Sequence, residues 1–347
     1  MTTIYLIRHA EAEGNLYRIA QGQHESALTD RGWRQVRALE KRFLSIPVDG
    51  VYTSPLYRAR ATASAVANPK GLPLIDVPEL CEIRVGDWEG RTWGEIARLY
   101  PEQTGSFNRE MDRWQVPGAE RPRDVLERVR KAVLSIAEAN DGKTVAVVSH
   151  GYAVRLLLGS LQGLSLKEIG NTPIGDNTAV SLLEGDGDHL QVLWRDDNRH
   201  LLTPEYLAQE PPGPRANALE TGLWFRPYGP GEPLPAGLDA LPVPEGGPEV
   251  LVLTGYLDET PVGVLALGPN LGRIALAYIA PDHRGRGLGT QLLGQAVQHT
   301  RRGGGNRLSA LGEPGNRFLL RNGFRPGGEG PEGGPALWEK DIGFPEL

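Results

Sequence analysis

A stretch rich in proline and glycine interrupts this chain well past its midpoint. The segment Gln209–Asn217 reads QEPPGPRAN, and proline and glycine recur from there to Pro248. Such a composition is typical of a linker followed by irregular structure. A chain of 347 residues also exceeds what one hydrophobic core usually organises. We therefore expect two domains, at 1–207 and 220–347, joined by a proline-rich linker at 208–219.

The composition and charge of the chain exclude several classes of function. A net charge of −6 and a pI near 5.7 argue against a general nucleic-acid binder, which needs basic surface to displace phosphate counterions. The single cysteine, Cys81, excludes an intramolecular disulfide and a cysteine-based zinc site, and it fits a reducing compartment. No apolar stretch reaches the length of a membrane span or a signal peptide. We expect a cytoplasmic protein that binds neither nucleic acid nor membrane.

Short, unbroken apolar runs alternate with helical patterns before the linker. Such runs are typical of strands buried in a parallel sheet. Thr29 is a candidate helix cap, and Ser54-Pro55 provides a second cap with a proline at the first helical position. The expected strands are Ile4–Ile7, Val51–Thr53 and Thr144–Ser149, and the expected helices follow Thr29 and span Arg58–Ala67 and Pro122–Ala139. This order predicts a three-layer α/β/α domain with a mainly parallel sheet, whose ligands bind beyond the carboxyl ends of the strands.

The residues expected at strand ends of this sheet carry the groups that phosphate chemistry requires. They are Arg8, His9, Arg58, Glu82 and His150. The oxygens of a phosphate monoester are anionic, so arginine side chains must offset their charge before a nucleophile can approach. A neutral imidazole can then attack phosphorus, which makes His9 the candidate nucleophile. Glu82 is the candidate acid that protonates the leaving alcohol and later activates water. The arginines supply the positive charge, so no metal is expected.

Four segments of the first domain follow one another in a recognisable order. They are LIRHAEAEGN at Leu6–Asn15, SPLYRARATA at Ser54–Ala63, LCEIRVGDWEG at Leu80–Gly90 and the SHG that begins at Ser149. In this order they resemble the histidine phosphatase, or phosphoglycerate-mutase-like, superfamily, and the resemblance extends over the whole first domain.

The resemblance to the histidine phosphatases implies a role for each residue. It implies that His9 is phosphorylated, that Glu82 is the proton donor, and that three further residues hold the phosphoryl group: Arg8, Arg58 and His150. It also implies that Asn15, Gln21 and Gly22 lie in the substrate pocket. The glycine and threonine frequent in the family's first motif are Ala10 and Ala12 here, so a hydroxyl that contacts phosphate is lost at Ala12.

The segment between the candidate acid and the second histidine bears on the type of phosphoryl transfer. In the mutases that the chain resembles, this segment is longer and forms a lid that keeps water out. Here only Arg84–Ser149 intervenes. We therefore expect hydrolysis of small phosphate monoesters, with mutase-type phosphoryl transfer as the alternative. Dephosphorylation of proteins and a non-catalytic phosphate sensor are weaker alternatives.

Beyond the linker, a glycine-rich turn separates expected strands from an expected helix. Glu249–Leu257 and Val262–Leu267 predict a hairpin with an acidic turn, Arg273–Ile279 predicts a third strand, and Gly289–Thr300 predicts a helix. The turn Arg284–Gly289 reads RGRGLG. Glycines allow backbone N–H groups to approach a pyrophosphate, and the helix N-terminus behind them favours its negative charge.

This pattern resembles the GNAT acetyltransferase superfamily, through IAPDHRGRGLGTQLL at Ile279–Leu293 and NRFLLRNGF at Asn316–Phe324. The resemblance implies an α+β domain with a mixed, mainly antiparallel sheet, which binds acetyl-CoA or another acyl-CoA and acylates an unknown amine. The residues implied in coenzyme binding are Ile279, Arg284, Gly285, Arg286, Gly287, Leu288, Gly289, Thr290 and Asn316.

Two departures from the GNAT pattern concern catalysis in the second domain. The tyrosine that frequently protonates the departing thiolate in the family is Leu319 here. The first two helices of the family, which shape the amine pocket, fall in the proline-rich stretch Pro227–Pro248, where helical periodicity is poor. An acyltransferase therefore has two alternatives: a module that binds acyl-CoA to regulate its neighbour, and a structural remnant.

Overall fold

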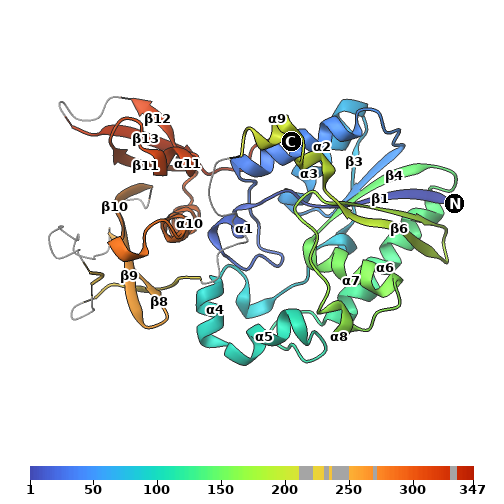
Figure 1. Ribbon diagram of the computed structural model, residues 1–347, viewed down its shortest axis with the longest axis horizontal. Coiled ribbons are helices and arrows are strands. Elements are labelled where there is room, and N and C mark those ends of the chain that lie inside the picture. Colours follow the sequence, from blue (N-terminus) through green and yellow to red (C-terminus); the bar gives the residue numbers. More distant parts are fainter. Residues whose placement is uncertain (211–221, 230–233, 237–249, 269–271, 329–333) are drawn as a thin grey trace.

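The computed structural model describes residues 1–210, 222–229, 234–236, 250–268, 272–328 and 334–347. These residues form two lobes, each built on its own sheet (Figure 1). We call residues 1–210 the N-terminal lobe and the described residues from 222 onward the C-terminal lobe. Most of the expected linker at 208–219 lies outside the described residues. Every helix within the described ranges is too short or too polar to cross a membrane.

The N-terminal lobe contains a six-stranded sheet in the order β3-β2-β4-β1-β5-β6. The first four strands of this order are parallel, β5 runs antiparallel to β1, and β6 runs antiparallel to β5. Its strands are β1 Thr2–Arg8, β2 Gly50–Thr53, β3 Leu74–Asp76, β4 Thr144–Ser149, β5 Val180–Gly185 and β6 Leu190–Asp197. Its α-helices are α1 Glu13–Tyr17, α2 Asp30–Phe43, α3 Tyr57–Ala67, α4 Trp93–Leu99, α5 Pro101–Arg109, α6 Pro122–Ala139, α7 Gly151–Leu161, α8 Leu166–Ile169 and α9 Pro204–Leu207.

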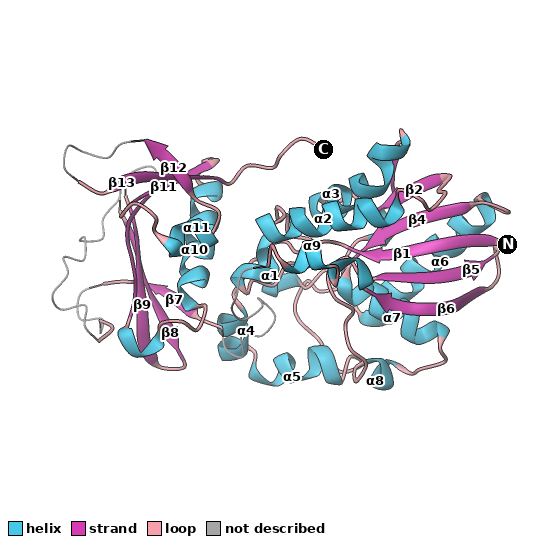
Figure 2. Ribbon diagram, turned by 45° about the horizontal axis from the view of Figure 1, so that its top comes forward, coloured by secondary structure: helices cyan, strands magenta, loops and turns pink. Residues whose placement is uncertain are grey.

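Helices cover both faces of this sheet. Figure 2 shows α2 and α3 on one side and α7 on the other. The side chains of β4 alternate between the two layers: Val145 and Val147 pack with α6 and α7, whereas Ala146 and Val148 pack with α2 and α3. Thr29 caps α2 as expected, because its Oγ1 accepts a hydrogen bond from the Gly32 amide. The predicted three-layer α/β/α architecture is confirmed.

The strand register brings three polar residues to one point. β1 and β4 pair in parallel with Arg8 opposite Ser149, so His9 and His150 leave the sheet side by side. Their ring centroids lie 5.2 Å apart. β2 pairs with the other side of β4, and Ser54 follows its last residue at the same edge. Three adjacent carboxyl ends therefore meet where ligands bind in parallel α/β sheets.

Three local predictions for this lobe were wrong. Ser54 does not cap α3, because the helix begins at Tyr57 with Leu56 as its N-cap, and the Ser54 hydroxyl bonds to His150 instead. Arg58 lies in the first turn of α3, not at a strand end. Glu82 also follows no strand: β3 ends early at Asp76, and a short 3-10 turn that begins with Pro78, which has no N–H for a ladder, precedes the Glu82 loop.

The C-terminal lobe contains seven described strands in the order β12-β13-β11-β10-β9-β8-β7. Every neighbouring pair is antiparallel except β10 and β11, which confirms a mixed, mainly antiparallel sheet. The strands are β7 Trp224–Pro227, β8 Leu251–Leu257, β9 Thr260–Leu267, β10 Arg273–Ile279, β11 Arg307–Gly312, β12 Arg325–Gly328 and β13 Ala336–Asp341. The helices are α10 Leu288–Arg302 and α11 Arg317–Arg321. The expected hairpin, third strand and helix are all present.

The two lobes are docked through a shared apolar cluster. Tyr17 and Ile19 of the N-terminal lobe pack among the core residues of the C-terminal lobe. Gly294 of α10 permits this approach, because a Cβ atom there would lie 2.5 Å from the Cβ of Tyr17. Thr92 Oγ1 also donates a hydrogen bond of 2.6 Å to the carbonyl of Leu223. The position of α10 is therefore fixed against α1.

Candidate functional site

A small pocket opens at the carboxyl ends of β1 and β4. Its volume is about 170 Å³. The predicted residues that line it are Arg8, His9, Asn15, Gln21, Gly22, Arg58 and Glu82. His150 is fully buried against the ring of His9. All eight residues predicted for this site are thus brought together at one edge of the sheet.

The ring of His9 is fixed in one tautomer. Its Nδ1 lies 2.7 Å from the carbonyl oxygen of Ala10, which can only accept, so Nδ1 carries the proton and Nε2 keeps its lone pair. Burial lowers the pKa of His9 well below its ordinary value, and the charges of Arg58 and Arg8 lower it further. His9 therefore presents a neutral imidazole with a free Nε2.

Arg8, which is partly buried, and Arg58, which is buried, place two positive charges in the same pocket. Arg8 donates through Nη1 to the carbonyl of Gly175, and the two Nη atoms of Arg58 donate to the carbonyls of His24 and Gly22. Among the described residues, the Nε–H of each arginine has no partner. These two unsatisfied donors can bind the oxygens of an anion. Within the same described part, no group of three His, Cys, Asp or Glu side chains could hold a metal ion.

His150 is held by a residue that the sequence analysis assigned to another role. Its Nε2 lies 2.8 Å from Ser54 Oγ, and its Nδ1 has no partner among the described residues. Burial and the charge of Arg58 keep the pKa of His150 well below its ordinary value. When Ser54 donates to Nε2, the Nδ1–H of a neutral His150 remains free for a ligand. A serine before Pro55 gave a cap signal, and only the register of β2 and β4 reveals its contact with His150.

The carboxylate of Glu82 is held by backbone amides. It accepts hydrogen bonds from the N–H groups of Ile83, Tyr152 and Ala153 at 3.0, 3.0 and 3.1 Å, and the last two belong to the first turn of α7. Arg128 of α6 donates to the carbonyl of Glu82 and so fixes the loop from behind. In the sequence, Arg128 belonged to the charged face of a helix, which gave no signal of this contact.

The three residues predicted to contact substrate differ in how they are held. Asn15 accepts a hydrogen bond from the Ala12 amide through Oδ1, which leaves its amino group for the pocket. Gln21 Oε1 is buried without a partner in the described part of the chain. Gly22 has a φ of +49°, and its carbonyl accepts from Arg58. A side chain at Gly22 would collide with Glu89, because a Cβ atom would lie 2.6 Å from Glu89 Oε1.

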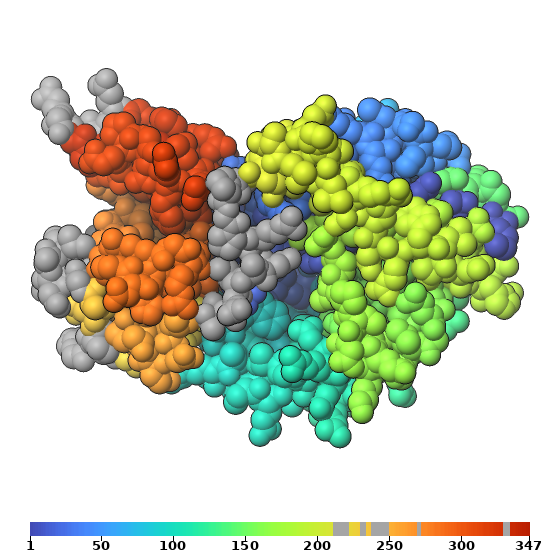
Figure 3. Space-filling model, viewed as in Figure 1, coloured from blue at the N-terminus to red at the C-terminus, as the bar shows by residue number. Residues whose placement is uncertain are grey.

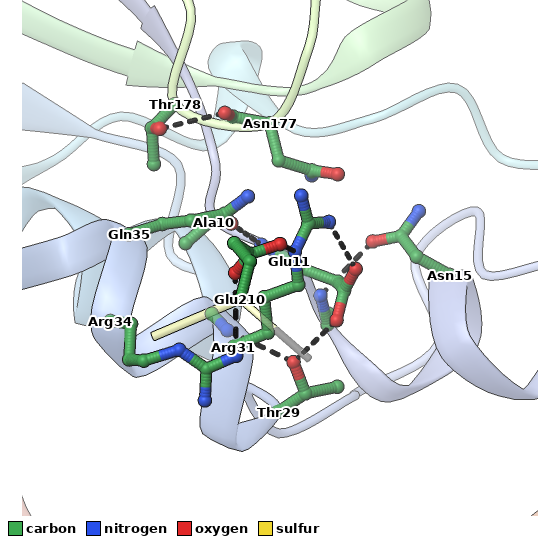
Figure 4. Close-up of polar contacts among 12 residues, drawn as sticks. Ala10, Glu11, Asn15, Thr29, Arg31, Arg34, Gln35, Asn177, Thr178 and Glu210 are labelled. Carbon is green, nitrogen blue, oxygen red and sulfur yellow. Dashed lines mark hydrogen bonds and ion pairs between the residues drawn. The ribbon is translucent and has the colours of Figure 1, made fainter. Parts of the chain in front are cut away.

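A buried ion pair that sequence reasoning missed supports the loop after His9. Figure 4 shows Glu11 accepting hydrogen bonds from Thr29 and Arg31, at 2.7 and 2.8 Å. Glu210 holds Arg31 from its other side. The sequence signal for this pair was a glutamate only two residues after the candidate nucleophile. Glu11 is buried in the structure, and a buried carboxylate is usually paired.

The same loop is also tied to the chain segment before β5. Asn177 Nδ2 donates a hydrogen bond of 2.9 Å to the carbonyl of His9, and the amide of Glu11 donates to Gln35 Oε1. The backbone that follows His9 is therefore fixed by the side chains of Gln35 in α2 and of Asn177 (Figure 4). A nucleophile held in this way needs little reorganisation to react.

The glycine-rich turn of the C-terminal lobe has the geometry of an anion cradle. Gly285 and Gly287 have φ values of +74° and +76°, and Gly287 is the N-cap of the 15-residue α10. Such φ values favour glycine and turn successive N–H groups toward one side. Arg284 is bound to the carbonyl of Ile279, and Arg286 lies beside His283. The turn thus places two left-handed glycines directly ahead of a helix N-terminus, whereas the amides of Arg284 and Thr290 donate to the carbonyls of Pro281 and Gly287.

The strand ends beside this turn separate from one another. β10 and β11 pair in parallel only at Arg273–Ser309 and Ile274–Ala310, so the two strands part beyond these positions. Asn316 Oδ1 caps α11 by accepting a hydrogen bond from the Leu319 amide, so this oxygen does not face a ligand. Leu319 is buried in the core of the lobe. The expected change of the amine pocket at Pro227–Pro248 falls largely outside the described residues.

Comparison with protein-family models divides the chain in the same way. Residues 4–198 match the model of the histidine phosphatase superfamily (branch 1). The chain belongs to this superfamily. Residues 219–324 match the model of the acetyltransferase (GNAT) family, so the C-terminal part carries a GNAT domain. Both resemblances seen in the sequence are confirmed.

Several proteins are similar in sequence to the N-terminal lobe. Phosphoserine phosphatase 1 of Hydrogenobacter thermophilus is 30% identical over 53% of this chain and 86% of its own length. The probable phosphoglycerate mutase GpmB of Serratia proteamaculans is 33% identical over 47% of this chain and 76% of its own. The metal-independent phosphoserine phosphatase of Arabidopsis thaliana is 36% identical over 45% of this chain and 67% of its own.

Solved structures of other proteins have the fold of the N-terminal lobe. Bacillus stearothermophilus YhfR matches with a TM-score of 0.56 and 33% identity, and covers 58% of this chain and 100% of its own. A phosphoserine phosphatase of Entamoeba histolytica, solved with 3-phosphoglyceric acid, matches with a TM-score of 0.51 and 25% identity over 58% of this chain and 100% of its own.

Proposed function

We propose that the N-terminal lobe hydrolyses small phosphate monoesters through a phosphohistidine at His9. The observation that carries this proposal is the state of the His9 ring: a neutral imidazole whose Nδ1–H is bound to a carbonyl, which leaves Nε2 as the nucleophile. The unpartnered Nε–H groups of Arg8 and Arg58 supply the positive charge that a phosphoryl group needs as it transfers.

The proposed reaction has two steps. In the first, His9 Nε2 attacks phosphorus and the ester P–O bond breaks, while protonated Glu82 gives its proton to the departing alcohol. In the second, Glu82 takes a proton from water, the resulting hydroxide attacks phosphorus, and the N–P bond breaks to release phosphate and neutral His9. The Nδ1–H of His150 stabilises the phosphoryl oxygens in both steps.

Hydrolysis is favoured over a mutase reaction by the short segment Arg84–Ser149. The names of the relatives include both phosphoserine phosphatases and probable phosphoglycerate mutases, so the family alone does not decide. Two of the three relatives named above are phosphatases of a small phosphorylated amino acid. We therefore place the substrate among small phosphate monoesters and keep a mutase as the alternative.

Two substrates distinguish these reactions. The protein should release phosphate from p-nitrophenyl phosphate and from 3-phosphoglycerate, and isomerisation of 3-phosphoglycerate without phosphate release would contradict the proposal. His9→Ala should abolish turnover and the acid-labile phosphoenzyme. His189→Ala is the matched control, because His189 is exposed on the hairpin between β5 and β6 and should leave both unchanged.

For the C-terminal lobe, we propose acyl transfer from acyl-CoA to an amine. The turn from Arg284 to Thr290 fits the pyrophosphate of the coenzyme, because its two left-handed glycines expose N–H groups ahead of α10. The bound coenzyme supplies an activated acyl thioester. Since Leu319 cannot donate a proton, the thiolate must depart without help from this position, and regulation of the first lobe by bound acyl-CoA remains the alternative.

Calorimetry and a thiol assay separate these alternatives for the C-terminal lobe. Acetyl-CoA should bind, and Gly287→Val should weaken binding, because valine is strained at a φ of +76°. Gly304→Val, at a φ of +82° beyond the end of α10, is a matched control for the strain itself. Release of CoA in the presence of an amine indicates acyl transfer; binding without release indicates a regulatory module.

We retain the division of the chain into domains at 1–207 and 220–347 with a linker at 208–219 as part of this proposal.

A further inference from the structure

A second, larger cavity adjoins the pocket of His9. Its volume is about 790 Å³, against about 170 Å³ for the inner pocket. Among the described residues, three line both spaces and form the neck between them: Arg18, Trp93 and Ile174. Figure 3 shows a hollow between the two lobes, with blue N-terminal residues at its floor. The inner pocket has room for a phosphoryl group and few further atoms, so the rest of a substrate must extend through the neck.

The C-terminal lobe builds one wall of this outer cavity. Trp224 of β7 and Leu257 and Asp258, at the end of the β8–β9 hairpin, line it. The indole of Trp224 is fixed, because it stacks on Tyr256 with ring centroids 4.4 Å apart and carries the Arg98 guanidinium 4.3 Å from its centroid. A GNAT domain thus contributes fixed surface next to a phosphatase pocket.

Arg18 presents a positive charge at the neck that no described residue pairs. It ends α1 with a left-handed φ of +61°, and its carbonyl accepts a hydrogen bond from the Trp93 amide, which holds this backbone against the start of α4. Its side chain makes no hydrogen bond or ion pair with any described residue, and its Nε is buried. Such a half-buried guanidinium has donors available for an anion.

Asp258 presents the opposite charge on the C-terminal lobe. It has a φ of +52° in the turn between β8 and β9, and its carboxylate makes no hydrogen bond or ion pair within the described ranges. Its neighbour Glu259 differs, since it forms an ion pair with Arg98 at 3.5 Å. Within the described ranges, the cavity therefore has a positive group without a partner at its neck and a negative group without a partner on its outer wall.

We propose that this outer cavity is the leaving-group subsite of the phosphatase, and that the substrate is the phosphate monoester of an amphoteric alcohol. Its carboxylate binds Arg18 close to the scissile phosphate, and a more distant ammonium group faces Asp258. The C-terminal lobe then contributes to substrate selection in the N-terminal lobe. This inference rests on the hydrolytic function proposed above, and it adds a substrate class and a second-domain residue to it.

Three probes test the two charges separately. p-Nitrophenyl phosphate has neither group, N-acetyl-O-phosphoserine has the carboxylate, and glycyl-O-phosphoserine has the same carboxylate and adds an ammonium group on the acyl carbon. Arg18→Gln should lower the ratio of kcat/KM for N-acetyl-O-phosphoserine to that for p-nitrophenyl phosphate by about tenfold or more. Asp258→Asn should lower the ratio of kcat/KM for glycyl-O-phosphoserine to that for N-acetyl-O-phosphoserine by about two- to fivefold. The effect is small because Asp258 is exposed and solvent screens its charge.

Matched controls remove the same charges elsewhere. Arg123→Gln on α6 and Asp188→Asn in the β5–β6 hairpin should leave all ratios unchanged. Asparagine tolerates the left-handed backbone at position 258, so Asp258→Asn keeps the turn. Wild-type protein that hydrolyses p-nitrophenyl phosphate with ratios unaffected by either substitution would overturn this inference alone. Failure to hydrolyse any of the three compounds would remove the proposed function and this inference with it.

Discussion

Arg301 of α10 forms an ion pair with Glu13 of α1, with 2.5 Å between Nη1 and Oε2. The carboxylate of Glu13 is only 9% exposed, and the guanidinium also lies over the ring of Phe344. α1 carries Asn15 of the phosphatase pocket, whereas α10 begins at the glycine-rich turn of the GNAT domain. One helix of each lobe thus reaches both a candidate site and the interface.

Loss of this ion pair should destabilise the docked protein. Arg301→Gln leaves the Glu13 carboxylate buried without its partner, and we expect a loss of about 2–3 kcal/mol in the free energy of unfolding measured in urea. Arg302→Gln is the matched control, because it removes a neighbouring charge at the exposed end of α10. A double-mutant cycle with Glu13→Gln should show coupling between the two residues, and independent effects would contradict an ion pair at this interface.

Replacement of two helical glycines by alanine should change the stability of the protein in opposite directions. Gly294→Ala places a Cβ atom 2.5 Å from the Cβ of Tyr17, so the lobes must separate and thermal stability should fall. Gly105 of α5 has no atom within 4 Å of the corresponding position, so Gly105→Ala should stabilise the protein by about 0.5–1 kcal/mol. Equal shifts of the melting temperature would mean that Gly294 does not mediate docking.

The sequence predicted those parts of the fold and site that depend on local pattern. β4 and α6 have the predicted bounds, because an unbroken apolar run and a regular apolar stripe are properties of consecutive residues. His9 and His150 follow strands, and neighbouring parallel strands end together. Ser54 was misassigned because a serine before proline is equally compatible with a helix cap and with a strand end.

Other features depend on contacts between distant segments. Arg128 fixes the Glu82 loop although it lies 46 residues further along the chain, and its place on a charged helix face carried no signal of this contact. Arg18 and Asp258 line one cavity only because α1 docks on α10 and the β8–β9 hairpin forms part of the outer wall of this cavity. No spacing in the sequence reports such a distance, since it is set by the packing of two separate sheets.

The hydroxyl of Ser54 should matter for catalysis more than for folding. Ser54→Ala removes the partner of His150 Nε2 and frees this ring to change its tautomer. We expect kcat/KM to fall about tenfold with little change in the melting temperature. Ser64→Ala is the control, because its hydroxyl is also mostly buried but bonds only within α3. An unchanged kcat/KM would show that His150 is oriented by other contacts.

The stability of the protein should fall in mild acid partly through His200. Burial and the charge of Arg42 lower the pKa of His200 to about 4 in the folded state, against 6.5 for the ordinary group. As the pH falls below 6.5, the unfolded chain binds this proton first, so the contribution of His200 is complete above 6.5 and is lost toward pH 4. This loss amounts to about 3 kcal/mol.

Urea unfolding at several pH values checks the expected contribution of His200. His200→Gln should flatten the decline between pH 6.5 and 4, whereas His189→Gln, at a 90% exposed side chain, should not. If both variants follow the wild-type curve, His200 takes up its proton in the folded state as readily as in the unfolded chain.

The ring of His9 should remain neutral in mildly acidic solution, because burial and the charges of Arg58 and Arg8 lower its pKa. Arg58→Gln removes the charge with the larger effect on this ring, so the pKa of His9 should rise and the ring should take up its proton at a higher pH. The titration is measured by ¹⁵N NMR, with the His9 resonances assigned by their loss in His9→Ala. Arg60→Gln, two residues further along α3 and paired with Asp76, should leave the midpoint unchanged. A wild-type midpoint at or above 6.5 would mean that the ring is protonated in mild acid, and an imidazolium has no lone pair with which to attack phosphorus.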